Sequence, residues 1–161
     1  MTPGDDMLVR RLEALLGTEA VRPGDSPPTA PGRSPEAWVT PREEEQVREL
    51  LTWATREKVP VYPRGGGTRW RAAFRPFRGG VGLDMRRLDR LEELDTDNLT
   101  VVAGAGLRHA ALEVVLAAHR LFFPPESASP EISTLGGELA TDASGPRKYG
   151  YGSLRAYLLG A

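Results

Sequence analysis

The sequence Val-Pro-Val-Tyr-Pro-Arg-Gly-Gly-Gly-Thr occupies residues 59–68 and places an apolar run directly before three consecutive glycines. The run is typical of a buried strand, and the glycines form the loop at its end. Glycine reaches positive φ without steric cost and lets the main chain approach a ligand closely. Successive backbone N–H groups in such a loop can converge on an anion, and Arg64 adds a positive charge beside them. The loop favours a phosphate site, although a lone Gly-Gly-Gly is just as typical of a plain surface turn.

A β-α-β arrangement is predicted around this loop. Residues 37–39 predict a short strand, and a helix is expected from Thr40-Pro41 to Glu57, with Thr40 as its N-cap and Pro41 at its first position. The strand at 59–62 should then be a parallel neighbour of 37–39, reached by a right-handed crossover. The apolar spacing predicts that the helix buries four residues, Val47, Leu50, Leu51 and Ala54.

The rest of the chain shows further elements and two loop-rich stretches. Before the β-α-β unit, the spacing predicts an amphipathic helix over 7–16, and the prolines and glycines of 22–36 predict a linker. After it come a strand at 82–85, a hairpin of 91–94 and 99–103 about the turn 95–98, and a helix at 107–120. Residues 124–153 are again rich in Gly, Pro and Ser, and the apolar run 155–161 predicts an element that is not finished. The fold class expected is α/β to α+β.

Composition limits the classes of function. The 161 residues carry 21 basic and 22 acidic side chains, a net charge of −1, which argues against a nucleic-acid surface. Cysteine is absent, so disulfides, thiolate metal sites and iron–sulfur clusters are excluded, and no metal site is expected. The first ten residues lack the apolar run of a secretory signal, and no stretch reaches the length of a transmembrane helix. We therefore expect a cytoplasmic protein.

A second glycine motif, Gly104-Ala-Gly106-Leu-Arg-His109, follows one expected strand and opens a helix. A dinucleotide-binding fingerprint has this layout, with an acidic residue about 20 positions further on, where Glu126 stands. The third glycine of the fingerprint lets the helix pack closely on the strand, and His109 stands at that position. A nicotinamide-binding Rossmann-like domain is therefore the weaker alternative.

Hydroxyl groups and glycines also gather between residues 133 and 147. Ser133 or Thr134 can cap a short helix, and Gly136, Gly137 and Gly145 leave the main chain bare. Such a segment suits an anionic ligand. It is also compatible with an ordinary loop-rich connection.

Taken in order, these motifs resemble a known family. Arg64–Thr68, the strand at 82–85 and Val102–Gly106 are followed by Phe123-Pro-Pro125, Thr134–Gly137 and Ser144–Arg147, as in the FAD-binding PCMH-type domain of the vanillyl-alcohol oxidase flavoprotein family. Three later segments are most similar to the FAD-binding subunit of bacterial glycolate oxidase: Gly145–Tyr149, Gly152–Arg155 and Leu159-Gly160. The resemblance covers about residues 36–161, so residues 1–35 are expected to be an N-terminal helix and linker, and the domain is expected to be truncated at its C-terminal end.

The resemblance implies which residues contact FAD. In the family, the loop that matches Arg64, Gly65, Gly66, Gly67 and Thr68 wraps the pyrophosphate with main-chain N–H groups. The stretches that match Pro125, Glu126, Ser127, Ser133, Thr134, Gly136 and Gly137 lie along the cofactor. Residues that match Thr141, Ala143, Ser144 and Gly145 approach the flavin ring, and Arg155 is expected to orient this last loop.

Departures from the family refine the expectation. Relatives that bind flavin covalently carry histidine after the glycines, where this chain has Thr68, so FAD should be bound non-covalently. Asp142 stands where relatives often have asparagine, and a carboxylate there opposes a reduced, anionic flavin. Glu138 replaces an apolar or amide residue and is expected to be solvent-exposed.

The resemblance implies FAD binding within a flavin-dependent oxidoreductase that acts on an α-hydroxy acid such as glycolate, as a subunit or fragment. Further subunits of a flavin oxidase complex are the expected partners. Binding to them would place the protein at the periphery of the inner membrane. The family's substrate domain is absent, so no catalytic residue is predicted. His109 and His119 are expected to be solvated or capping residues. A non-catalytic interaction module remains the second alternative, and it would bind no cofactor.

Overall fold

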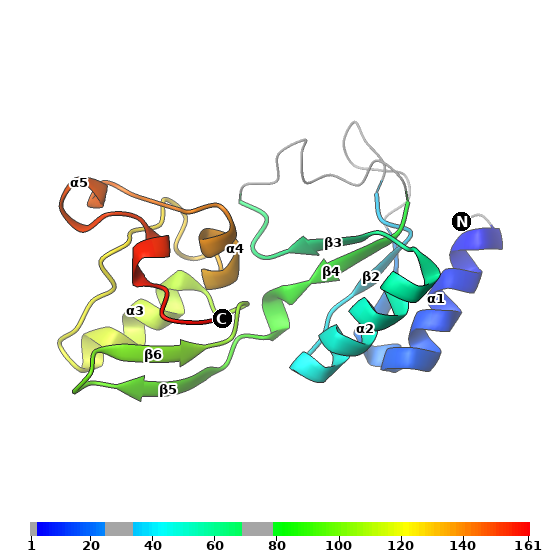
Figure 1. Cartoon of the computed structure of the whole chain (residues 1–161), viewed down its shortest axis with the longest axis horizontal. Coiled ribbons are helices and arrows are strands. Elements are labelled where there is room, and N and C mark those ends of the chain that lie inside the picture. Colours follow the sequence, from blue (N-terminus) through cyan, green and yellow to red (C-terminus); the bar gives the residue numbers. More distant parts are fainter. Residues whose placement is uncertain (1–2, 25–33, 69–78) are drawn as a thin grey trace. The chain divides into compact units, whose positions relative to one another are not determined.

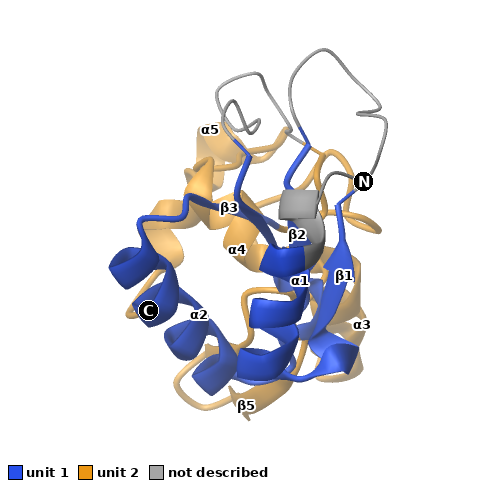
Figure 2. Ribbon diagram, turned by 90° about the vertical axis from the view of Figure 1, so that its right-hand side faces the viewer, with its two compact units in different colours: residues 1–64, 70–87 blue, residues 65–69, 88–161 orange. Residues whose placement is uncertain are grey.

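The computed structural model describes residues 3–24, 34–68 and 79–161. The chain divides into two compact units, which Figure 2 distinguishes by colour. The first unit comprises residues 1–64 and 70–87, and the second comprises residues 65–69 and 88–161. Each unit has its own hydrophobic core and is described by itself.

The first unit contains a four-stranded mixed sheet with the order β1-β2-β4-β3 (Figure 1). Its strands are β1 (Val21–Pro23), β2 (Ala37–Val39), β3 (Val61–Arg64) and β4 (Val81–Asp84). β1 is antiparallel to β2, whereas β2, β4 and β3 are parallel. The fold class is therefore mixed α/β, as the sequence predicts.

The predicted adjacency of β2 and β3 is wrong, because β4 lies between them and pairs with both. The cross-strand pair of Trp38 and Gly82 gives the physical reason. A Cβ on Gly82 would lie 2.5 Å from the Trp38 ring, so only glycine leaves room for the indole over β4. All four residues of β4 are buried, as expected of a central strand.

Two helices cover the sheet of the first unit. They are α1 (Pro3–Leu16), followed by the 3₁₀ turn η1 (Thr18–Ala20), and α2 (Glu44–Glu57). Val9, Leu12 and Leu16 of α1 join Leu50 and Ala54 of α2 in one core with the strands. Trp53 is also buried there, whereas Leu51 is 45% exposed, so the prediction that Leu51 is buried is wrong.

The predicted start of α2 is also wrong. Its N-cap is Glu43, and Thr40 lies in an extended segment after β2. The Thr40 amide donates to the Ala20 carbonyl at 2.7 Å, so Thr40 continues the pairing towards β1, and the helix begins after Glu43. Pro41 is buried in the connection. The C-terminal end at Glu57 is confirmed, and Lys58 follows it in the left-handed region with φ 57°.

Part of the predicted linker forms an edge strand. Arg22 and Pro23 belong to β1, whose position at the sheet edge tolerates a proline that donates no hydrogen bond. The Gly24 amide donates to the Glu36 carbonyl at 2.9 Å, which closes the end of this strand pair. Residues 25–33 of the predicted linker lie outside the described part of the chain.

The second unit begins with a confirmed hairpin. β5 (Leu91–Asp95) and β6 (Thr100–Ala103) are antiparallel, and Asp95 Oδ1 accepts hydrogen bonds from the amides of Asp97 and Asn98, both at 2.9 Å. α3 (His109–Ala118) buries Leu112 and Leu116, which pack with Leu107 and the hairpin. A short 3₁₀ turn of the first unit, η3 (Met85–Arg87), precedes this region.

The C-terminal segment of the second unit contains short helices separated by loops. They are α4 (Leu135–Ala140), α5 (Lys148–Tyr151) and the 3₁₀ turn η4 (Leu154–Tyr157). Ala143 and Leu154 are buried, and the Leu154 amide donates to the Ala143 carbonyl at 3.2 Å. The apolar residues that follow η4 are exposed, Leu159 to 85%.

Candidate cofactor site

The glycine loop, residues 65–68, lies against the segment 132–137 of the same unit. A Cβ on Gly65 would overlap the Thr134 hydroxyl oxygen, and a Cβ on Gly66 would overlap the Ile132 carbonyl oxygen. Gly67 has φ 75°, a conformation that L side chains rarely adopt. These two glycine- and hydroxyl-rich stretches, far apart in sequence, are therefore brought together by close main-chain contact.

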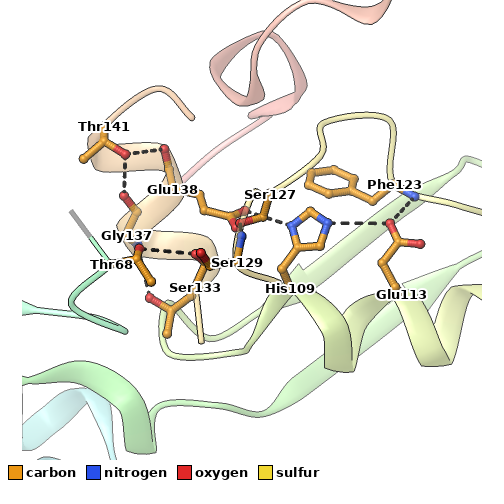
Figure 3. Close-up of polar contacts among 11 residues, drawn as sticks. Thr68, His109, Glu113, Phe123, Ser127, Ser129, Ser133, Gly137, Glu138 and Thr141 are labelled. Atoms are coloured by element: carbon orange, nitrogen blue, oxygen red, sulfur yellow. Dashed lines mark hydrogen bonds and ion pairs between the residues drawn. The ribbon is translucent and has the colours of Figure 1, made fainter. Parts of the chain in front are cut away.

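Hydroxyl groups lie between the two stretches. Thr68 Oγ1 and Ser133 Oγ are 3.3 Å apart, and either can donate to the other (Figure 3). Thr134 is 1% exposed, and its hydroxyl accepts from the Gly137 amide at 3.3 Å, which caps α4. The prediction that Ser133 or Thr134 caps a short helix is confirmed, and Thr134 is the capping residue.

The backbone N–H groups of the glycine loop are free to bind an acceptor. Within the described residues, the amides of Gly65 to Thr68 donate to no protein oxygen. Unpaired amide donors beside two hydroxyl groups are the donor set that a pyrophosphate requires. The residues present therefore fit a diphosphate cofactor.

In the second glycine motif both glycine amides are already paired. The Gly104 amide donates to the Arg90 carbonyl and the Gly106 amide to the Leu88 carbonyl, both at 2.8 Å. The preceding strand, β6, belongs to an antiparallel hairpin, whereas the dinucleotide fingerprint follows a strand of a parallel sheet. The structure therefore argues against a nicotinamide site at Gly104–Gly106.

The segment around Pro125 is brought close to Gly145. Pro125 is buried, and a Cβ on Gly145 would lie 2.5 Å from the Glu126 carbonyl oxygen. The Arg147 guanidinium lies 3.8 Å from the Glu126 carboxylate. Ser127 Oγ accepts from the Ser129 amide at 3.3 Å. These residues form a second cluster of the predicted site.

The residues after α4 are held by their own helix and by η4. The Thr141 hydroxyl donates to the Gly137 carbonyl at 3.0 Å, and the Ala143 amide donates to the Glu138 carbonyl at 2.8 Å. A Cβ on Gly136 would lie 2.8 Å from the Ala105 side chain, so this glycine allows close packing. Ser144 is half-buried in the loop that follows.

Asp142 has φ 46°, a conformation that Asp and Asn adopt more readily than other residues. Its carboxylate accepts from the Arg155 amide at 3.2 Å. A hydrogen bond from Ser153, together with that amide, holds the pKa of Asp142 below its ordinary value. The main-chain amide of Arg155 thus contacts this loop, whereas the orienting role expected of Arg155 stays a prediction.

Arg64 belongs to the first unit, at the end of β3. Its guanidinium lies over the Trp38 ring, 5.4 Å from the ring centroid. This is a favourable cation–π distance. A contact of Arg64 with a phosphate stays a prediction.

Sequence reasoning missed a buried pair beside the site, His109 and Glu138. They are 3% and 5% exposed, so the expectation of a solvated His109 and an exposed Glu138 is wrong. His109 Nδ1 lies 2.9 Å from Glu138 Oε2 (Figure 3). The available signal was their placement, since Glu138 replaces an apolar or amide residue of the family and His109 stands where the dinucleotide fingerprint has glycine. His119 is exposed at the C-cap of α3, as predicted.

The described residues contain neither a metal-binding cluster nor a membrane-spanning helix. In the described ranges, no group of three or more His, Asp or Glu side chains is arranged to hold a metal ion. No helix in that part of the chain has both the length and the apolar character needed to cross a bilayer.

The sequence matches the model of a protein family described as FAD binding domain over residues 35–161. The chain belongs to this family. The match includes both stretches that meet at the proposed phosphate site, 65–68 and 132–137. FAD is therefore the cofactor of the family to which this FAD-binding domain belongs.

Relatives of this FAD-binding domain include enzymes of hydroxy acids. It is 34% identical over 156 residues to a D-lactate dehydrogenase of Archaeoglobus fulgidus, covering 96% of this chain and 35% of the relative. It is 32% identical over 126 residues to the glycolate oxidase subunit GlcD of Bacillus subtilis, covering 78% of this chain and 27% of the relative. The chain thus spans about a third of the length of these relatives.

A solved structure has the same fold. The FAD-binding domain superposes on alkyldihydroxyacetonephosphate synthase with a TM-score of 0.82 and 26% identity, covering 99% of this chain and 32% of the synthase. The fold of the chain therefore already occurs in an experimental structure.

Proposed function

We propose that this chain binds FAD non-covalently and serves as the cofactor-binding part of a flavin-dependent oxidoreductase that acts on an α-hydroxy acid. The observation that carries the proposal is the contact of the glycine loop with residues 132–137, which gathers unpaired amides and hydroxyls at one place. Polar hydrogens at that place match the oxygens of a diphosphate. In the second glycine motif, the amides of Gly104 and Gly106 already donate to main-chain carbonyls.

The roles of the residues follow from their donors. The amides of Gly65–Thr68 would donate to pyrophosphate oxygens, and the hydroxyls of Thr68 and Ser133 would add two further donors. The stretch 125–127 and the loop 141–145 are proposed to lie along the ribityl chain and the ring. When bound, FAD supplies the acceptor for a hydride from the substrate carbon.

Non-covalent binding is supported by the residues available for a tether. The chain contains no cysteine, and Thr68 stands where a tethering histidine would follow the glycines. A threonine side chain lacks the imidazole nitrogen through which histidine bonds covalently to the flavin ring. We therefore expect acid to release the flavin intact.

The substrate class is supported by three relatives. Their printed names are D-lactate dehydrogenase, glycolate oxidase subunit and D-2-hydroxyglutarate dehydrogenase, and each substrate is a 2-hydroxy acid. Glycolate and D-lactate are the first substrates to test. The name of the second relative, a glycolate oxidase subunit, also supports a role of this chain within a complex of several subunits. Binding to such subunits would place the chain at the periphery of the inner membrane.

The domain boundary is proposed near residue 36, with residues 1–35 as an N-terminal extension. The family match begins at residue 35. The extension is nevertheless part of the first unit's core, since Val9 and Leu12 are buried in it. Removing the extension should therefore weaken the sheet as well as shorten the chain.

The test is a reconstitution with excess FAD, followed by gel filtration and a visible absorbance spectrum before and after acid precipitation. We expect yellow protein whose flavin is released by acid. If the 161-residue chain elutes colourless, the same test is made on a chimera that continues after Ala161 with the residues of the Archaeoglobus relative that this chain does not span. A folded chimera that also lacks flavin would contradict the proposal.

Two glycine variants locate the site. Gly66→Ala places a methyl group on the Ile132 carbonyl and should weaken FAD binding by about tenfold or more, because the loop and the segment 132–137 must separate. Gly150→Ala is the control, since its Cβ meets no atom within 4 Å. Equal FAD affinities for the two variants would place the cofactor elsewhere.

A further inference from the structure

A buried acid–base pair joins α3 to α4. His109 is the first residue of α3 and Glu138 lies in α4, and both side chains are more than nine-tenths buried. The 2.9 Å contact between His109 Nδ1 and Glu138 Oε2 is therefore shielded from water. Neither residue has a role among the FAD contacts proposed above.

The second nitrogen of His109 also faces a carboxylate. His109 Nε2 lies 3.7 Å from Glu113 Oε1, which accepts the Phe123 amide at 3.0 Å (Figure 3). The Phe123 ring covers the imidazole, with 5.8 Å between ring centroids. A neutral imidazole has one N–H, whereas the imidazolium has two and can face both acids. The geometry therefore favours the protonated form.

The pKa of His109 agrees with this geometry. Burial alone would lower it, but the hydrogen bond to Glu138 and the charges of Glu138, Glu113 and Glu126 outweigh burial and raise it above 6.5. These three acids are the charged groups that face His109, from α4, from α3 and from the loop between them.

Glu138 directly follows Gly136 and Gly137 in the sequence. Its backbone amide donates to the Thr134 carbonyl at 2.9 Å, so the residue belongs to the turn that Thr134 caps. Glu138 Oε1 is buried and has no hydrogen-bond partner within the described residues. In the described part of the chain, the contact with His109 compensates this buried carboxylate and no second donor reaches Oε1.

We propose that His109 and Glu138 are positioning residues of the FAD phosphate site: the imidazolium holds α4 against α3 and neutralises a carboxylate that would otherwise repel the pyrophosphate. This proposal rests on the proposed function. When His109 loses its proton, the buried Glu138 side chain no longer faces a positive charge beside the dianionic ligand. FAD affinity should then fall as the pH rises through the folded-state pKa of His109, and be retained below it.

The first test is a titration of FAD fluorescence quenching across about pH 5.5 to about pH 9, where a raised histidine pKa is sampled. The wild type should lose affinity by about tenfold over this range, the effect of one charge-assisted contact. Glu138→Gln removes the charge that needs compensation, so its affinity should not vary with pH. His109→Gln should bind as weakly at low pH as the wild type does at high pH.

His119→Gln is the matched control, because His119 is exposed at the other end of α3. It should reproduce the pH profile of the wild type. If the pH dependence of FAD affinity disappears in His119→Gln, it arises from His119 and not from His109, and the proposal is overturned. An affinity of the wild type that stays flat across the range would overturn it as well, even if Glu138→Gln did not fold.

A second readout needs no flavin. The pKa of His109, followed by NMR of its ring protons in the FAD-free chain, should fall in Glu138→Gln relative to the wild type. An unchanged pKa would show that the pair is not coupled. FAD that binds equally well to wild type, Glu138→Gln and His109→Gln at every pH would overturn the positioning role alone, whereas no FAD binding by the chain or the chimera would overturn the proposed function with it.

Discussion

At the residue scale, Asp84 is a buried carboxylate whose two oxygens are both bound by Arg86. Arg86 Nε donates to Oδ1 at 2.8 Å and Nη2 donates to Oδ2 at 2.6 Å, while the Asp84 side chain is 3% exposed. Burial alone would raise the pKa of Asp84, but the hydrogen bonds from Arg86 outweigh it and hold the pKa below 3.8. The ionised form is thus favoured in the folded state. Its contribution to stability is present above pH 3.8 and is lost as the pH falls through the lower, folded-state pKa.

Asp84→Asn should lower the free energy of unfolding by about 1–3 kcal/mol at neutral pH, because it removes a charge-assisted, two-point contact. The difference from the wild type should shrink in acid, where the carboxylate is protonated. Urea unfolding at neutral pH and at about pH 3 measures both values. Asp97→Asn is the control, since Asp97 is exposed in the hairpin turn and should change stability little. A cost that is the same at both pH values would contradict the linkage.

At the element scale, α2 shows which face of a helix is buried and how the helix ends. Leu50 and Trp53 face the core, whereas Leu51 faces solvent. Lys58 closes the helix with φ 57°, and its amide donates to the carbonyls of Ala54 and Thr55. A non-glycine residue in this conformation carries a steric cost that glycine avoids.

Trp53→Ala should destabilise the protein by about 3–5 kcal/mol, because it empties a large buried volume. Leu51→Ala should cost less than about 1 kcal/mol, since the leucine already contacts water. Thermal or urea unfolding followed by circular dichroism compares the two. Equal costs would mean that α2 presents a different face from the one described.

Lys58→Gly should stabilise the protein by about 1 kcal/mol, because glycine adopts the left-handed conformation without strain. Glu49→Gly, on the exposed face of the same helix, should have the opposite sign and a cost of about 1 kcal/mol. Both are measured as shifts of the urea midpoint. Destabilisation by both variants would contradict the strain assigned to Lys58.

The helices and strands show which structural features can be predicted from local sequence. The Asp95 turn and the C-terminal end of α2 carry strong local signals, and both were predicted correctly. The start of α2 was not, because Thr40 continues the strand pairing with a distant segment at Ala20 and the helix begins only after Glu43. β1 was not predicted, because Pro23 is typical of a linker. The position of β4 depends on how Trp38 fits over Gly82. Local patterns predict elements and hairpins, but they do not predict pairing between strands that are distant in sequence.

At the scale of the whole molecule, each of the two units contains a buried ionisable group that affects its stability. One group acts in acid, and the other acts as the pH rises. Asp84 belongs to the first unit and the His109–Glu138 pair to the second. The glycine loop and the segment 132–137 could be predicted as a pair from the order of motifs. The His109–Glu138 pair could not, since 29 residues separate the two and no local pattern links one to the other.

Raising the pH above 6.5 should weaken the second unit, because a histidine whose folded-state pKa is raised stabilises fully below its ordinary value and less as the pH passes the raised one. Hydrogen exchange, corrected for the intrinsic pH dependence of the amides, should show loss of protection in α3 and α4. Amides of β2 and β4 should keep theirs. Loss of protection in β2 and β4 over the same pH range would contradict a local origin.

The position of β4 between β2 and β3 also dictates an order of events during synthesis. Residues 37–39 and 61–64 leave the ribosome before residues 81–84, the strand with which both must pair. Until then neither strand has its parallel partner, and α1 and α2 have no completed surface to cover. Closing the loops that join these strands is an entropic cost that precedes any ladder. A nascent chain should therefore expose the apolar faces of α1 and α2 until β4 emerges, and a chaperone that binds apolar segments would act in that interval.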